Sequence, residues 1–159
     1  MINLVYNSRR QAHKGDKLSA MEDIYLNPKG NANSLMQFNM AYADIHGAQR
    51  IIGFGKMELV NTLRAKKSKL HIDATFDCCP KGFYQCLIVS IFMDTNGENG
   101  LFLPCFYILM SKKSRGAYVM ALSSLNNLLG GAMDPQFVMH DFEVAMRQGI
   151  AMVFPGTRR

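Results

Sequence analysis

The sequence lacks the features that mark several large protein classes. Its longest nearly uninterrupted apolar runs are Cys86–Met93 and Leu101–Met110, far shorter than the roughly 20 residues that cross a bilayer as a helix. No charged N-terminal segment followed by an apolar stretch is present, so no secretory signal is visible. The four cysteines form no C-x-x-C pair, which argues against a zinc site and favours reduced thiols. We therefore predict an intracellular chain with no membrane partner.

The common catalytic fingerprints are missing as well. The sequence contains no G-x-x-x-x-G-K-[ST], G-x-G-x-x-G or G-x-S-x-G motif, which removes the usual nucleotide-binding and hydrolase signatures. What is present is a chain of 159 residues, 48% hydrophobic and 19% charged. This composition is sufficient for one domain with a buried core.

Positive charge is unevenly distributed along the chain. Residues 1–70 hold 11 Lys or Arg and 5 Asp or Glu, whereas residues 71–159 hold 7 of each. The formal net charge of +6 therefore lies in the first part, which argues against a uniformly basic packaging protein. We predict that residues 1–55 form a basic, loosely organised leader and that residues 56–159 form the folded domain.

A short basic run follows the predicted leader. The spacing of apolar residues predicts a helix over residues 56–67, and its end carries four cations, Arg64, Lys66, Lys67 and Lys69. Cations near the C-terminus of a helix interact favourably with its dipole. The same four side chains would also suit contact with the phosphates of a nucleic acid. The sequence leaves both interpretations open.

From residue 70 onward the pattern predicts strands. Leu70–Phe76 alternates apolar and polar side chains, which is the period of a half-buried strand. Phe83–Met93 and Leu101–Met110 are apolar runs joined by a polar turn that contains Asn-Gly, a strong hairpin signal. We therefore expect an antiparallel meander of three strands. Pro104 lies within the third run, so this strand is expected at a sheet edge or with a bulge.

The remaining residues predict a return to the sheet. A glycine pair ends a predicted helix whose buried face carries Tyr118, Leu122, Leu125 and Leu129. A strand over 137–140 and a helix over 141–152 follow, with Phe142 expected on the buried side. The crossover can place the fourth strand parallel to the first. We predict an α/β fold with a mixed sheet in the order βββαβα. This order is similar to that of ribonuclease-H-like folds, although several α/β layouts share it.

Two aspartates are the strongest candidates for chemistry. Asp73 lies within the first predicted strand of the meander, and Asp141 follows the fourth strand. If these strands are parallel neighbours, the two carboxylates converge and can bind a divalent cation through oxygen. Alternatively, Asp141 is the N-cap of a helix and Asp73 faces solvent. Asp77 lies too far along the strand to share an ion with Asp73, and Glu143 is expected to favour the helix N-terminus electrostatically.

Several spaced motifs resemble the transposase domain of Mutator-like elements (MULE), a member of the ribonuclease-H-like DDE superfamily. They occur in the family's order between about Arg50 and Pro155, and the two aspartates have a separation that suits the family. The motifs are Leu70-His-Ile-Asp-Ala-Thr-Phe76, Pro80, Phe83-Tyr84-Gln85, Pro104, Tyr107-Ile-Leu109, Tyr118 and His140-Asp-Phe-Glu-Val-Ala145.

The resemblance implies a metal-dependent DNA transposase. Asp73 would be the first catalytic, metal-binding carboxylate and Asp141 the second, holding Mg²⁺ or Mn²⁺ for cleavage and joining of DNA strands. The implied partners are transposon ends and target DNA, with a homo-oligomer left open. The implied location is the nucleus.

Two departures from the family pattern qualify this expectation. Ala74 replaces a glycine. The sequence ends with residues 154–159, where the family would continue into a fifth strand and a helix with the third acidic residue. We therefore expect a C-terminally truncated catalytic domain that is inactive, or nearly so, alone. One alternative is a non-catalytic DNA-binding or protein-interaction module derived from a transposase. Another is a partly unfolded product without a function of its own.

Overall fold

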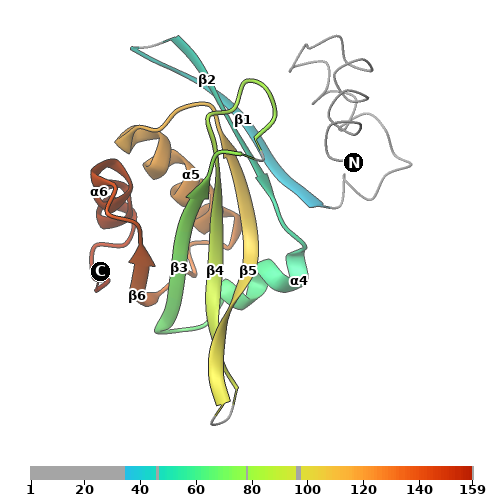
Figure 1. Ribbon diagram of the computed structural model, residues 1–159, viewed down its shortest axis with the longest axis vertical. Helices are drawn as coiled ribbons and strands as arrows, with labels where there is room; N and C mark the ends of the chain where they lie inside the picture. Colours follow the sequence, from blue (N-terminus) through green and yellow to red (C-terminus); the bar gives the residue numbers. More distant parts are fainter. Residues whose placement is uncertain (1–34, 46, 78, 96–97, 159) are drawn as a thin grey trace.

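A computed structural model describes residues 35–45, 47–77, 79–95 and 98–158, which form one six-stranded sheet and three α-helices (Figure 1). The strands are β1 (Met36–Asp44), β2 (Gly47–Phe54), β3 (Ser68–Thr75), β4 (Gln85–Thr95), β5 (Glu98–Met110) and β6 (Pro135–His140). The helices are α4 (Met57–Val60), the 3-10 helix η1 (Asn61–Arg64), α5 (Arg115–Leu128) and α6 (Val144–Val153). None of the helices in these residues is long and apolar enough to span a membrane.

The sheet is mixed, as the sequence predicted. Its strand order is β1-β2-β5-β4-β3-β6. Strands β3, β4 and β5 form the expected antiparallel meander. The fourth predicted strand, β6, pairs parallel to β3, which confirms the crossover expected from the sequence. The α/β class and the mixed sheet are therefore confirmed.

Pro104 is accommodated by a bulge in β5. The β4–β5 register passes from Val89 opposite Phe106 to Ser90 opposite Pro104, so one residue of β5 has no partner. Strand β2 pairs with β5 only over residues 107–110, so Pro104 removes no hydrogen bond from that side of the ladder. Of the two alternatives for this strand, the bulge is correct, and β5 lies inside the sheet rather than at its edge.

The expectation of a loosely organised N-terminal segment is corrected for residues 36–54. These residues form the β1–β2 hairpin, and β2 pairs with β5, so the hairpin adds two strands to the sheet. Phe38 anchors β1 by packing on Phe106 of β5, with ring centroids 5.6 Å apart. A Cβ on Gly53 would lie 2.5 Å from the Phe38 ring, so glycine permits this contact. Residues 1–34 of the predicted leader lie outside the described part.

The helix expected over residues 56–67 is shorter than predicted. It ends at Arg64, after α4 and η1. Lys67 has a φ of 53°, a left-handed conformation that ends any helical path and turns the chain into β3. Lys66 and Lys67 therefore lie in a turn, and Lys69 lies in β3. A favourable interaction with the helix dipole is left as an interpretation for Arg64 alone.

Helices α5 and α6 pack together against one face of the sheet. The predicted buried face of α5 is confirmed, because Tyr118, Leu122 and Leu125 are fully buried. Ser114 caps the start of α5 by accepting a hydrogen bond from the Ala117 N–H. A Cβ on Gly149 of α6 would lie 2.6 Å from Tyr118 Cβ, so α6 approaches α5 as closely as only a glycine allows.

The topology brings three connections to the same edge of the sheet. Because β3, β5 and β6 run in the same direction, the segments 76–84, 111–114 and 141–143 all follow strand ends at one edge. We call this the pocket edge, and it is the upper end of the sheet in Figure 1. The opposite edge carries the starts of β3 and β6. In α/β sheets, ligands bind beyond the carboxyl ends of the strands.

Candidate functional site

The two predicted aspartates follow neighbouring strand positions. In the parallel β3–β6 pair, Ile72 is opposite His140. Asp73 is the residue after Ile72, and Asp141 is the residue after His140. Each carboxylate is oriented by its own backbone. Asp73 Oδ1 accepts a hydrogen bond of 2.8 Å from the Ala74 N–H, and Asp141 Oδ1 accepts one of 2.6 Å from the Phe142 N–H. The register thus brings together the two residues that the sequence singled out.

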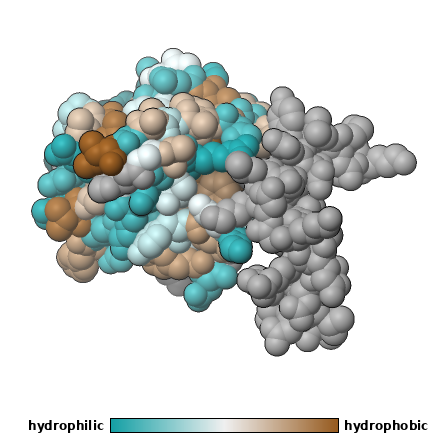
Figure 2. Space-filling model, turned by 90° about the horizontal axis from the view of Figure 1, so that it is seen from above, coloured by the Kyte–Doolittle hydropathy of each residue, from teal (hydrophilic) through white to brown (hydrophobic). Residues whose placement is uncertain are grey.

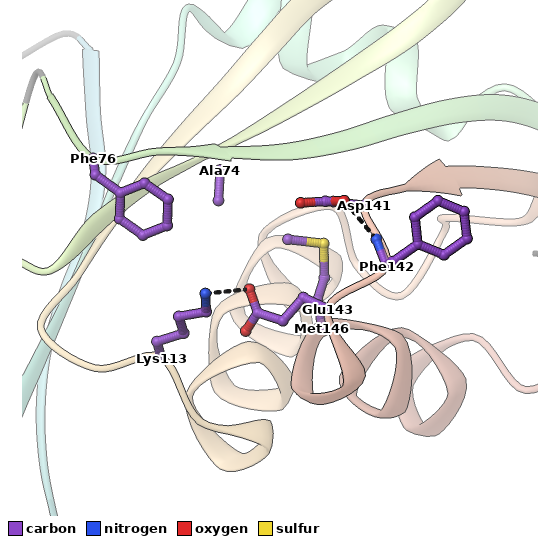
Figure 3. A pocket seen from close by; sticks show the side chains of 7 residues that line it. All are labelled: Ala74, Phe76, Lys113, Asp141, Phe142, Glu143 and Met146. Carbon is purple, nitrogen blue, oxygen red and sulfur yellow. Dashed lines mark hydrogen bonds and ion pairs between the residues drawn. The ribbon is translucent and has the colours of Figure 1, made fainter.

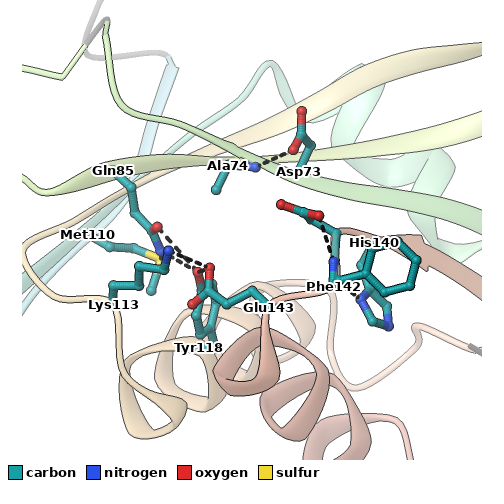
Figure 4. A network of polar contacts seen from close by, with 10 residues as sticks. Asp73, Ala74, Gln85, Met110, Lys113, Tyr118, His140, Phe142 and Glu143 are labelled. Carbon is teal, nitrogen blue, oxygen red and sulfur yellow. Dashed lines mark hydrogen bonds and ion pairs between the residues drawn. The ribbon is translucent and has the colours of Figure 1, made fainter.

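The two side chains occupy different surroundings. An open pocket of about 340 Å³ at the pocket edge is lined by Ala74, Phe76, Lys113, Asp141, Phe142, Glu143 and Met146 (Figure 3). Asp141 lines it and Asp73 does not, since successive side chains of a strand point to opposite faces. Figure 4 shows the Asp73 carboxylate on the side of β3 away from Tyr118 and Glu143.

Glu143 joins three elements through a polar network beside the pocket (Figure 4). Its Oε2 accepts a hydrogen bond of 3.0 Å from the Tyr118 hydroxyl and lies 3.1 Å from Lys113 Nζ. The fully buried Gln85 of β4 donates to the Tyr118 oxygen over 2.8 Å. The network connects β4, the start of α5 and the start of α6. It therefore fixes the connection that carries Asp141.

Burial determines the protonation state of this network. Desolvation raises the pKa of the Tyr118 hydroxyl well above its ordinary value, and the neighbouring Glu143 carboxylate raises it further, while Gln85 acts in the opposite sense. Tyr118 is therefore a neutral donor at all physiological pH values. The second oxygen of Glu143, Oε1, is buried without a hydrogen-bond partner in the described residues. A buried, unsatisfied acceptor costs free energy, so the contacts on Oε2 must offset it.

Three expectations about the segment 141–143 are corrected. Asp141 is not the N-cap of α6, because Glu143 occupies that position and makes no side-chain capping bond. Phe142, expected on the buried side, is 100% exposed. Glu143, expected to act on the helix dipole, instead bonds Tyr118 and Lys113. Helix α6 starts three residues later than predicted, at Val144. Residues 141–143 are therefore not helical, and the helical spacing does not predict which way their side chains point.

The sequence analysis missed Lys113 and Gln85 as site residues. Lys113 Nζ lies 5.3 Å from the centre of the Phe76 ring in addition to pairing with Glu143. Both Gln85 and Tyr118 lie within the motifs of the resemblance, and this was the only signal that could have linked them. No periodicity indicates that residues 33 positions apart share a hydrogen bond.

The four basic residues lie away from the pocket. Arg64, Lys66, Lys67 and Lys69 are all exposed, and they precede or begin β3, at the opposite edge from Asp141. Lys69 Nζ lies 5.3 Å from the centre of the Phe92 ring. Lys67 lines a second open pocket together with Asp134 and residues 153–157. Lys69 and Asp73 lie four residues apart within β3, and the other three basic residues precede the strand.

Within the described residues, no group of three or more His, Cys, Asp or Glu side chains is arranged to hold a metal ion. Comparisons with protein-family models, with curated proteins and with solved structures each found no match to the chain. The MULE resemblance therefore stays a prediction from motifs.

Proposed function

We propose that this chain carries the metal-binding core of a DDE-type DNA transposase of the MULE family, with Asp73 and Asp141 as the metal carboxylates. The observation that carries the proposal is the parallel β3–β6 register, which sets Ile72 opposite His140 immediately before the two aspartates. The sequence analysis expected this pairing from the order of the strands and the crossover between them.

The donor set suits Mg²⁺ or Mn²⁺. Each aspartate uses one oxygen for the following backbone N–H, and neither second oxygen has a hydrogen-bond or ion-pair partner among the described residues. Hard carboxylate oxygens are the ligands that Mg²⁺ prefers, and it commonly takes only one or two carboxylates together with substrate phosphates. A bound divalent ion would supply charge stabilisation for phosphoryl transfer. Asp73 and Asp141 would hold it at the end of the β3–β6 pair, Asp141 from inside the pocket and Asp73 from the neighbouring strand position outside it.

The strand arrangement also supports the proposal. The order β5-β4-β3-β6, with only β6 parallel to its neighbour, is the arrangement that a ribonuclease-H-like βββαβα core requires. The hairpin β1–β2 is an addition at the far side of β5. DNA as the substrate implies action in the nucleus. Because no group of three such side chains in the described residues is arranged to hold a metal ion, we propose weak metal binding and little or no strand cleavage by the chain alone.

A calorimetric titration with Mn²⁺ tests the proposal. We expect one weak site in the wild type and its loss in both Asp73→Asn and Asp141→Asn, because each variant removes one anionic ligand. Asp134→Asn is the matched control, since Asp134 is an exposed aspartate that precedes β6 at the opposite edge. Equal heats for the wild type and both site variants would remove the metal site.

A second candidate function is a non-catalytic DNA-binding module. It is favoured by the exposed basic residues at the opposite edge, Arg64, Lys66, Lys67 and Lys69. If these contact phosphates, the slope of log affinity against log salt should fall by about 0.9 for each residue changed to Gln. Arg147→Gln, an exposed cation of α6, is the control. Duplex binding that depends on these residues and not on Mn²⁺ would favour this function over the first.

A further inference from the structure

Three aromatic side chains are exposed at the pocket edge. Phe142 is 100% exposed, Tyr84 54% and Phe76 47%. Phe76 and Tyr84 contact each other edge to face, with ring centroids 5.6 Å apart. Leaving large apolar rings in water forgoes the free energy of their burial, and exposed apolar groups gathered at a pocket mark binding sites. Nothing in the packing of α6 requires a phenylalanine at position 142.

Two of these rings, Phe76 and Phe142, line the pocket together with Asp141. Figure 3 shows Phe76 and Phe142 on opposite sides of it, with Lys113 between β5 and α5 on the same side as Phe76. The pocket volume of about 340 Å³ lies at the small end of the range for ligand sites. Figure 2 views the pocket edge from above, and apolar residues appear there as separate areas among hydrophilic ones. This pattern differs from the continuous apolar surface of a protein-docking face.

Basic residues lie on the Phe76 side of the pocket. The segment that follows β5 carries Lys112 and Lys113, and Arg115 begins α5. Lys113 is close to both the Phe76 ring and the Glu143 carboxylate. Exposed aromatic rings beside cations match the two parts of a nucleotide, because a base can stack on an exposed ring and its phosphate can pair with a cation.

We infer that the pocket takes a single unpaired DNA base, which stacks on Phe142, while Phe76 and Lys112, Lys113 or Arg115 contact the flanking nucleotide and its phosphate at the other side of the pocket. The inference rests on the proposed function for the choice of DNA as the ligand. It adds that the site acts on DNA with an unstacked nucleotide next to the metal carboxylates. Enzymes that work on DNA gain access to a strand in this way at the cost of unstacking one base.

A fluorescence titration tests the inference. One short DNA duplex carries 2-aminopurine as a single bulged, unpaired base, and a second duplex carries it paired with thymine. In buffer with EDTA, the wild type should bind the bulged duplex about ten-fold more tightly, a difference of about 1.4 kcal/mol, and quench its emission by stacking. Phe142→Ala should remove this preference. Because Phe142 is fully exposed, the substitution does not threaten the fold.

Two further variants make the result specific. Phe76→Ala, at the other side of the pocket, should weaken the preference as well. Phe137→Ala, which removes a 36% exposed ring from β6 toward the opposite edge, should keep it. Equal affinity of the wild type for the two duplexes would overturn the inference, and so would an unchanged preference in Phe142→Ala.

The outcome is separable from that of the metal proposal. If the bulged base stacks and the Mn²⁺ titration shows no site, the base pocket stands and the metal core is wrong. If Mn²⁺ binds through Asp73 and Asp141 while Phe142→Ala has no effect, the metal core stands and the base pocket is wrong.

Discussion

The two edges of the sheet differ in how tightly their side chains are held. At the pocket edge, Gln85, Tyr118, Glu143 and Lys113 form a connected network behind Asp141. At the opposite edge, the four basic residues are exposed. Lys69 lies over the ring of Phe92 in a cation–π contact. Positioned groups suit chemistry, whereas exposed cations suit contact with a polyanion that needs no fixed geometry.

Under the proposed functions, this difference suits separate tasks for the two edges. A carboxylate that binds a metal must be held by its surroundings, and the Glu143 network holds the segment on which Asp141 lies. Exposed lysines contribute through their charge and lose little when they move. If the comparison is correct, substitutions at the pocket edge should change stability and those at the opposite edge should change only DNA affinity.

The largest effect is expected from Gly149→Val. Its side chain would collide with Tyr118 Cβ, because even a Cβ would lie 2.6 Å away. Separating α5 from α6 should lower the free energy of unfolding by about 3 kcal/mol. Gly156→Val is the matched control at the opposite edge, where a Cβ meets nothing within 4 Å. Urea denaturation measures both variants, and equal midpoints would show that the pocket edge is not more tightly packed.

A smaller effect is expected from Glu143→Ala. It removes the acceptor of the Tyr118 hydroxyl and the partner of Lys113, which should destabilise the fold by about 1–3 kcal/mol. Asp134→Ala, an exposed carboxylate at the opposite edge, should change stability by less than about 0.5 kcal/mol. Thermal unfolding of the two variants measures the difference. A neutral Glu143→Ala would mean that the network does not hold Asp141.

The smallest effect concerns Tyr118 and pH. The folded state raises the pKa of Tyr118 above its ordinary value of 10.0, so the folded protein keeps a proton that the unfolded chain loses as pH rises above 10. Stability from this group is full below pH 10 and falls above it. Tyr118→Phe should show a smaller fall, with the remainder due to Tyr42, whose pKa burial also raises, while Tyr107→Phe, an exposed control, should retain the full fall. Unfolding in urea between pH 9 and 11 would show parallel curves if Tyr118 plays no part.

Much of the sheet could be predicted because its signals are local. The alternation of Leu70–Phe76, the Asn-Gly turn and the glycine pair after α5 each specify backbone geometry through neighbouring residues. The hairpin β1–β2 was missed, although Phe38, Met40 and Tyr42 alternate with more exposed residues. Ala41 and Ala43, on the more exposed side of the strand, are not polar, so the alternation of apolar and polar residues is weak. Contact of Phe38 with Phe106 stabilises the hairpin, and this contact joins positions far apart in the chain.

For the candidate site, the sequence by itself determined the two aspartates and the order of the strands that carry them. A crossover after this order can place β6 beside β3, and the β3–β6 pairing confirms that expectation. Only the tertiary structure decided how their surroundings are built. Helix α6 begins at Val144 because Glu143 is held by Tyr118 and Lys113, and this leaves Asp141 in the pocket and Phe142 in solvent. Backbone pairing follows from local pattern, whereas the direction of a side chain after a strand end depends on contacts made across the fold.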